Sequence, residues 1–309
     1  MMCIKERNTS DSTCKKLLRD KGCFADLCNY AFFQGRQVIQ PEELVSREND
    51  LSTLIGKVDK PTEIKRYRDV VRKASIHGEY VIIGVEHQST FDEKMIFRIL
   101  NYDATIYINQ VESKQEVYPV GSFVFYTGDK EWKSPETLKG TLKNIPSEME
   151  PYINDWRLPV VELKTMDARK LTNQRLKEVV EISQSMFAGN YDDLRNNRKI
   201  ETESFMMAAT FTRTKIKRED LPEGDEINMC EAMDRLFQRF ENQGMEKGKI
   251  IGFEKGKSDT LKEQLKVKLG TLSRPLEKQL TNTSLEKLNE LTLNIFNVTN
   301  EDDVLRIIN

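Results

Sequence analysis

A continuous apolar run fills residues Tyr80–Val85 and is rich in β-branched side chains. The run is too short to span a membrane, and its composition predicts a buried central strand. Glu86 and Gln88 continue the same strand. Because side chains alternate across a sheet, these two polar groups share one face and His87 points to the other. Burying polar groups costs free energy, so the pattern indicates that they bind or catalyse something.

Apolar residues elsewhere recur at helical spacing or in short extended runs. Helices are predicted over residues 14–33, 92–112, 172–187 and 201–212. Extended segments are predicted over residues 66–72, 80–88, 119–126 and 153–163. Strands and helices in this order predict an α/β fold, in which helices pack on a mixed central sheet and a helical C-terminal extension follows.

Composition divides the chain into four parts. Residues 1–13 are polar and are expected to be disordered. A main domain is predicted over residues 14–220, a charged glycine-punctuated helix or linker over 221–258, and a small helical module over 259–309. The terminal segment of this last module is apolar enough to dock either on the same chain or on a second copy, and we favour homo-oligomerisation through the C-terminal helices.

Glycine recurs at every fourth residue of the third part, at Gly244, Gly248, Gly252 and Gly256. Inside a helix each glycine costs about 0.8–1 kcal/mol relative to alanine. A partner helix that packs closely could offset this cost, and a flexible linker explains the pattern equally well. The charged residues between the glycines exclude a pair of membrane helices.

The charge balance limits how the chain could bind nucleic acid. Charged residues make up 32% of the 309 residues, yet the net charge is only −2, which excludes a bulk attraction to DNA. Contacts with DNA would therefore come from local basic clusters. Two clusters are candidates: Lys65, Arg66, Arg68, Arg72 and Lys73, and further on Arg213, Lys215, Lys217 and Arg218. A solvated charged face explains the second cluster at least as well.

The remaining inventory excludes several classes of protein. The five cysteines do not form paired CxxC motifs, so we expect reduced thiols in a cytoplasmic protein. The chain has only two histidines, His77 and His87, which are too few to favour a histidine zinc site or a Ser-His-Asp triad. The chain has no glycine fingerprint for nucleotides and no apolar stretch of about 18 residues, so no membrane association is expected.

A pair of carboxylates offers a site for a metal ion. Asp69 lies on the extended segment before the central strand, and a turn at His77–Gly78 joins the two segments. An Asp on one strand and the Glu86-x-Gln88 motif on the next can reach one cation. Ligation by oxygen alone favours Mg²⁺ or Mn²⁺ over Zn²⁺. An exposed strand end with Asp69 in a loop would give the same sequence pattern.

This arrangement resembles the PD-(D/E)XK nuclease superfamily, and more closely its bacterial recombination-promoting nuclease and transposase family. Similar flanking segments are residues 24–33, residues 35–44, Met95, Arg98, Tyr102, residues 125–128, Trp132, Pro135 and Leu138. The resemblance covers about residues 15–215. The order of the segments carries it, because no single motif is specific.

The resemblance implies a restriction-endonuclease-like core and a Mg²⁺- or Mn²⁺-dependent DNA endonuclease linked to recombination or mobile elements. Asp69 and Glu86 would bind the metal, and Gln88 would position the attacking water. Asp26 would be a further catalytic acid, since the superfamily often has one on its first helix; a surface carboxylate is the alternative.

The DNA backbone would be bound by four arginines, which are Arg66, Arg68, Arg72 and Arg98. Arg98 falls outside the apolar stripe of its helix, so it either approaches a phosphate or lies along the surface of the core.

Two departures from the superfamily pattern affect this prediction. Gln88 stands where the superfamily usually has a lysine, and no proline precedes Asp69. A glutamine can orient a water but brings no charge to the transition state. The closer family itself tends to carry Glu-x-Gln. The alternative is a nuclease fold that has lost catalysis and serves as a DNA-binding or assembly module.

Overall fold

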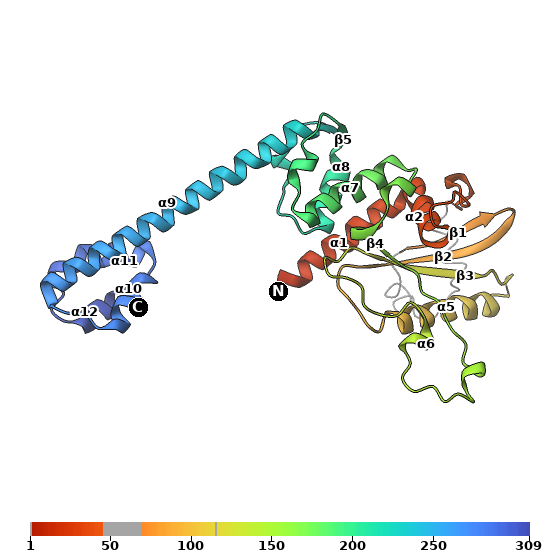
Figure 1. The fold of residues 1–309 in the computed structure, drawn as a ribbon, viewed down its shortest axis with the longest axis horizontal. Coiled ribbons are helices and arrows are strands. Elements are labelled where there is room, and N and C mark those ends of the chain that lie inside the picture. Colours follow the sequence, from red (N-terminus) through yellow and green to blue (C-terminus); the bar gives the residue numbers. More distant parts are fainter. Residues whose placement is uncertain (1, 46–69, 115) are drawn as a thin grey trace. The chain divides into compact units, whose positions relative to one another are not determined.

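The computed structural model describes residues 2–45, 70–114 and 116–309. The chain divides into two compact units, Met1–Asp234 and Arg235–Asn309. The first unit has a mixed α/β architecture with a four-stranded sheet flanked by helices, and the second is helical (Figure 1). None of the described helices is long and apolar enough to cross a membrane.

The helices of the first unit are α1 (Met2–Arg19), α2 (Lys21–Phe33), α5 (Met95–Glu112), α6 (Leu138–Thr141), α7 (Gln174–Ala188) and α8 (Thr202–Phe211). Its main strands are β1 (Val70–Ile76), β2 (Glu79–Gln88), β3 (Val120–Tyr126) and β4 (Val160–Glu162). A separate two-stranded sheet pairs β5 (Lys199–Glu201) with β6 (Glu226–Asn228), and the sequence analysis did not predict it.

The four main strands lie in the order β1-β2-β3-β4. Strands β1 and β2 form an antiparallel hairpin whose register runs from Val70 opposite Val85 to Ile76 opposite Glu79. His77 and Gly78 connect them, both with positive φ (53° and 90°), as the tight turns of hairpins require. The pairs β2–β3 and β3–β4 are parallel, and α5 makes the crossover between β2 and β3. The predicted mixed sheet is therefore confirmed.

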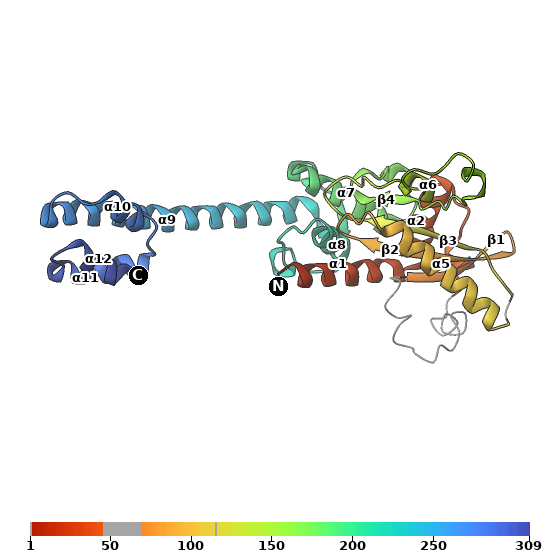
Figure 2. The same ribbon diagram turned by 90° about the horizontal axis from the view of Figure 1, so that it is seen from below.

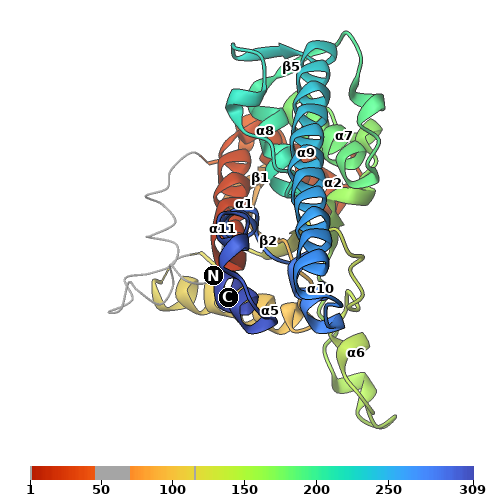
Figure 3. The same cartoon turned by 90° about the vertical axis from the view of Figure 1, so that its left-hand side faces the viewer.

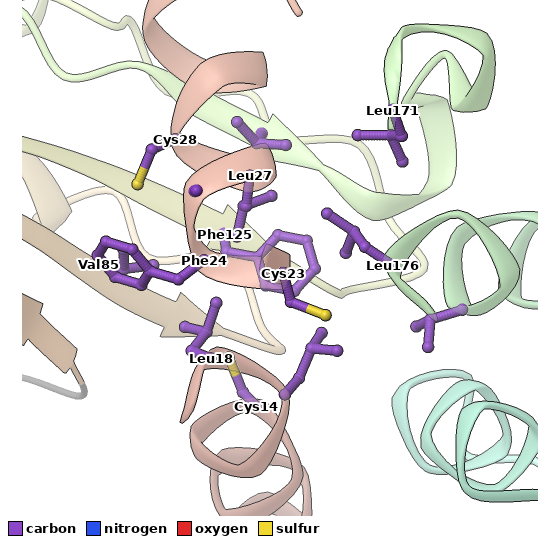
Figure 4. Packing of buried hydrophobic residues seen from close by; sticks show 14 of the residues in the cluster. Cys14, Leu18, Cys23, Phe24, Leu27, Cys28, Val85, Phe125, Leu171 and Leu176 are labelled. Atoms are coloured by element: carbon purple, nitrogen blue, oxygen red, sulfur yellow. The ribbon is translucent and has the colours of Figure 1, made fainter. Parts of the chain in front are cut away.

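Each face of the sheet has its own apolar core. On one face, α1, α2 and α7 cover β2 and β3 through a large cluster that includes Leu18, Phe24, Val85, Phe125 and Leu176 (Figure 4). On the other face, α5 packs through Ile96 and Ile99 against Val124 and Tyr126 of β3. Seen from below, α5 lies across the near side of the strands (Figure 2). The sheet is thus buried on both faces, as the apolar run of β2 predicts.

The N-terminal helices differ from the sequence prediction. Helix α1 begins at Met2, within the segment that was expected to be disordered, and Ser10 in that segment is buried. The single helix predicted over residues 14–33 is divided at Asp20. Asp20 has an extended backbone conformation (φ −65°, ψ 123°), and its side chain accepts a hydrogen bond from the backbone N of Cys23. An N-cap with this geometry starts a new helix, so α2 takes a direction of its own.

The helices of the second unit surround a small core. Helix α9 (Met229–Leu269) begins in the first unit and continues through Gly244, Gly248, Gly252 and Gly256 without a break. Its last turns pack against α10 (Arg274–Thr281), α11 (Leu285–Asn294) and α12 (Glu301–Ile308), through a leucine-rich cluster (Figure 3). Asn300 caps α12 by accepting a hydrogen bond from the backbone N of Asp303, and α11 begins after Ser284.

Candidate functional site

Glu86 is buried at the end of β2 and binds an arginine from the neighbouring helix. Only 5% of Glu86 is exposed, and its Oε1 accepts a hydrogen bond of 2.9 Å from Nη2 of Arg98 on α5. Arg98 also donates from Nη1 to Oδ2 of Asp92 (3.1 Å) and from Nε to the Tyr102 hydroxyl (3.3 Å). The exposed Arg98 side chain thus joins the buried carboxylate to the surface.

The pKa of Arg98 reflects this position. Partial burial alone would lower its pKa, but the hydrogen bond to Tyr102 and the negative charge of Glu86 outweigh burial and raise it above the ordinary value. Arg98 therefore carries its charge at every pH at which the protein is folded. The guanidinium of Arg98 pairs with a buried acid, so its side chain does more than lie along the surface of the core; an approach to a phosphate stays a prediction.

Gln88 lies beside Glu86 on the same face of β2. Its Nε2 donates to Oε1 of Glu86 at 3.4 Å, and 3% of the residue is exposed. The parallel register aligns Gln88 with Tyr126 of β3, and Tyr126 with Glu162 of β4. These residues form one row across the carboxyl ends of three parallel strands. In open α/β sheets this edge is the usual place for a ligand.

Tyr126, Glu162 and Trp132 were not predicted as members of the site. Tyr126 is buried, and burial together with the charge of Glu162 raises its pKa, although Arg213 opposes the shift. Glu162 accepts a hydrogen bond of 3.2 Å from the backbone N of Trp132. Glu162 ends a strand of only three residues, so no alternating pattern in the sequence marks which way its side chain points.

The close approach of Tyr126 to the following turn explains Gly128. A Cβ atom at Gly128 would fall on the phenol ring and hydroxyl of Tyr126. The turn after β3 therefore needs a residue without a side chain where the tyrosine folds back over it. Gly128 fixes the position of Tyr126 at the edge of the sheet.

The opposite face of β2 carries a second polar network, which we call closed because its imidazole and hydroxyl are buried and only Asp11, with 33% of its side chain exposed, reaches the surface. Nδ1 of His87 lies 2.9 Å from Oδ1 of Asp11, and its Nε2 lies 2.8 Å from the hydroxyl of Thr127. This confirms that His87 and Glu86 point to opposite faces. The row of carboxylate, imidazole and hydroxyl has the composition of a catalytic triad, but Thr127 is 1% exposed, so its hydroxyl cannot reach a substrate.

Asp26 and Arg72 also lie on this closed face, apart from Glu86. Oδ2 of Asp26 accepts hydrogen bonds from the backbone N of Thr172 (2.8 Å) and Asn173 (2.9 Å), where α7 begins. Arg72 donates from Nη2 to the carbonyl oxygens of Leu18 and Arg19 at the end of α1, each at 2.9 Å. The structure therefore gives these two residues roles in helix capping and does not bring them to the Glu86 edge.

Three predicted site residues, Asp69, Arg66 and Arg68, lie outside the described residues. Within the described part of the chain, no group of three or more His, Cys, Asp or Glu side chains is arranged to hold a metal ion. The described strands offer the oxygens of Glu86, Gln88 and Glu162 at this edge of the sheet, and oxygen donors suit Mg²⁺ or Mn²⁺.

Comparison with known proteins gives one match. Residues 62–213 match the model of a family described as "Putative transposase, YhgA-like". No curated protein matches the chain, and no solved structure does. The matched region contains β1 to β4, α5, α7 and α8, and hence both Glu86 and the residues of the row at the carboxyl edge.

Proposed function

We propose that the chain is a metal-dependent DNA endonuclease that hydrolyses phosphodiester bonds and is linked to recombination or mobile elements. The observation that carries the proposal is the burial of Glu86 and Gln88 side by side at the carboxyl edge of the sheet. The family match supports a role on DNA, since a transposase acts on DNA. The mixed sheet with its β1–β2 hairpin and α5 crossover is consistent with a restriction-endonuclease-like core.

In this proposal Asp69 and Glu86 hold Mg²⁺ or Mn²⁺. Asp69 precedes Val70, and Val70 pairs with Val85, which precedes Glu86. Because the register brings the first residue of β1 next to Glu86 and Asp69 directly precedes that residue in the sequence, a joint role for the two carboxylates is supported. Bound there, the cation supplies a water of lowered pKa and positive charge for the phosphate.

The protein's own side chains complete the site. Gln88 orients the attacking water through its amide, in the place of the superfamily's lysine. Arg98 holds the carboxylate of Glu86 in position and presents its partly exposed guanidinium to the phosphate backbone. Arg66 and Arg68 belong to the same proposal as further backbone contacts. Binding of this kind is directed at phosphates and weakens as salt rises.

Cleavage of supercoiled plasmid tests the proposal. The wild type is incubated with Mg²⁺, Mn²⁺, Ca²⁺ or EDTA, beside Asp69→Asn, Glu86→Gln and the control Glu93→Gln, an exposed acid on the loop after β2. Nicking that needs Mg²⁺ or Mn²⁺, is lost in the first two variants and persists in the control is the expected result. No cleavage by a folded wild type under any cation overturns it.

A second candidate function is a nuclease fold without catalysis that binds DNA or assembles other proteins. The ion pair between Arg98 and Glu86 favours it, because it neutralises the acid that the metal needs. Binding of DNA that is unaffected by EDTA, together with no cleavage, would support this alternative over the nuclease.

We also propose that the chain forms homo-oligomers through its C-terminal helices. Large apolar side chains are exposed along α9, among them Phe240, Ile251 and Phe253. At the glycines of α9, the space that a Cβ would fill meets no atom of the described chain beyond the helix's own backbone. A second helix could approach there closely. Light scattering of the wild type and of Ile251→Lys tests this, and a wild type that stays monomeric at all concentrations excludes it.

A further inference from the structure

Three aromatic rings lead from the interior of the sheet to the surface beside Gln88. Tyr126 is buried in the core, and its ring packs edge to face on Trp132 with centroids 5.1 Å apart. Trp132 packs in the same way on Phe91, at 5.3 Å and an angle of 73° between the ring planes. Phe91 is 42% exposed. The row therefore ends in an aromatic ring that is supported from behind and open to solvent.

The loop that carries Phe91 is fixed on both sides. Nη2 of Arg213 donates to the backbone oxygen of Ser89 at 3.3 Å. Asp92 accepts from Nη1 of Arg98 and from the backbone N of Lys94. Phe91 lies between these anchors, so its backbone is held and the ring loses little further entropy when it binds a ligand.

The position of Phe91 relates it to the proposed nuclease site. It follows Gln88 by three residues, and the arginine that binds Asp92 beside it also binds Glu86. An exposed aromatic ring is by itself ordinary, as Phe97 on α5 shows with the same 42% exposure. Phe91 differs from Phe97 in two ways: Trp132 supports its ring edge to face, and Arg98, which binds the neighbouring Asp92, also binds the buried Glu86.

We propose that Phe91, supported by Trp132, stacks on an unpaired nucleobase next to the phosphate that is cleaved. The inference rests on the proposed function and adds a preference for strands whose bases are unpaired. Single-stranded nucleic acids are typically bound by aromatic rings for the bases and by cations for the backbone. Here the base would lie on Phe91, and Arg98 and Arg213, which anchor its loop on either side, would provide the positive charge.

The test measures binding without requiring cleavage. Trp156→Phe leaves Trp132 as the one tryptophan of the chain, so its fluorescence reports on the aromatic row. In EDTA, this protein is titrated with a twelve-residue oligothymidylate and with an abasic strand of the same length, which has the phosphates without the bases. Stacking predicts quenching of Trp132 and tighter binding of the strand that has bases.

Variants of Phe91 then separate stacking from other contacts. Phe91→Ala should weaken binding of oligothymidylate roughly 5- to 150-fold and leave the abasic strand unaffected, which abolishes the preference between the two. Phe91→Tyr should restore the preference and Phe91→Leu should not. Phe97→Ala, equally exposed on the neighbouring helix, is the control and should behave as the parent.

The outcomes distinguish this inference from the proposed function. If Phe91→Ala keeps the full preference for the strand with bases, or if Phe91→Leu restores it, the stacking proposal is wrong, whether or not plasmid is cleaved. The protein could fail to cleave DNA and still prefer the strand with bases, with that preference lost in Phe91→Ala. This outcome would support the stacking site and reject the nuclease proposal.

Discussion

The two faces of β2 both bury polar side chains, but they connect them differently. On the face of α1 and α2, His87 lies between Asp11 and Thr127, and only the carboxylate of Asp11 reaches solvent. On the face of α5, Glu86 connects through Arg98 to Asp92 and to solvent. The difference teaches that burial of a polar residue does not by itself indicate function. A network that presents a cation at the surface can bind an anionic ligand, and one whose imidazole and hydroxyl stay buried stabilises the fold.

Asp26→Asn should be the most destabilising change on the closed face. The asparagine keeps one acceptor oxygen, so it can satisfy either the backbone N–H groups of Thr172 and Asn173 or Nε2 of Gln37, but its NH₂ group then faces the other donor. Leaving that donor unsatisfied should lower the free energy of unfolding by about 1–3 kcal/mol. Denaturant unfolding measures this, with the exposed Asp193→Asn as control. A loss of plasmid cleavage by a variant of unchanged stability would instead return Asp26 to a catalytic role.

His87→Phe removes the hydrogen bonds of the closed network and keeps a ring of similar size. The side chains of Asp11 and Thr127 then lose their partner, and we expect a loss of about 2 kcal/mol in the free energy of unfolding. Cleavage per folded molecule should not change. If cleavage falls while stability is kept, the closed network takes part in the chemistry.

Gly128→Ala tests the carboxyl edge of the sheet, where Tyr126 packs on the turn after β3. The new methyl group must displace the phenol of Tyr126, which is held by Trp132, and such overpacking typically costs about 1–2 kcal/mol. Because Tyr126 supports the aromatic row, quenching of Trp132 by oligothymidylate should weaken as well.

Gly189→Ala is not a useful control, because that glycine has a positive φ. Ser122→Ala on the same strand is also unsuitable, since its hydroxyl binds Asp103. Lys130→Ala, an exposed position in the same turn as Gly128, is the suitable comparison.

Glu86→Gln should change stability by less than about 1 kcal/mol, because the open network keeps Arg98 paired with Asp92 at the surface. Its effect should appear in cleavage alone. Glu86→Gln should therefore lose activity and keep its stability, whereas Asp26→Asn should lose stability. A Glu86→Gln protein that unfolds as easily as Asp26→Asn would remove the distinction between the faces.

The smallest expected effect is the pH dependence of stability that comes from the carboxyl group of Asp167. It is half-buried, and hydrogen bonds from the side chain and the backbone N of Arg169 lower its pKa from 3.8 to about 2. Because the folded-state pKa lies below the ordinary one, its contribution to stability is present above pH 3.8 and is lost as the pH falls towards 2. An NMR titration of the carboxyl group should give the lowered midpoint, and Arg169→Ala should raise it towards the ordinary value while keeping the bond from the backbone N–H.

Much of the fold could be predicted from the sequence because it follows from local patterns. Residues close together in the sequence determine the apolar run of β2, the helical stripe of α5 and the turn at His77–Gly78. The division at Asp20 and the pairing of β5 with β6 depend on hydrogen bonds that propensity does not reveal. The mixed sheet followed from the alternation of strands and helices, whereas the order of its four strands was not predicted.

The site could be predicted only in part, for the same reason. Glu86 and Gln88 were found because their polarity interrupts a buried strand, and the opposite direction of His87 followed from alternation. The partners of Arg72 and Asp26 are backbone atoms of distant helices, which no spacing in the sequence discloses. Glu162 and Trp132 join the site through the parallel register of β4, and that register is set by tertiary packing.

The register of the sheet also fixes the order in which the site can assemble during synthesis. Glu86 and Gln88 enter a hairpin whose two strands are adjacent in the chain, so it closes early. Tyr126 reaches Gln88 only after α5 has been made, and Glu162 reaches Tyr126 later still. The carboxyl edge is therefore completed late, and a chain that is still on the ribosome carries no complete site until β4 has emerged.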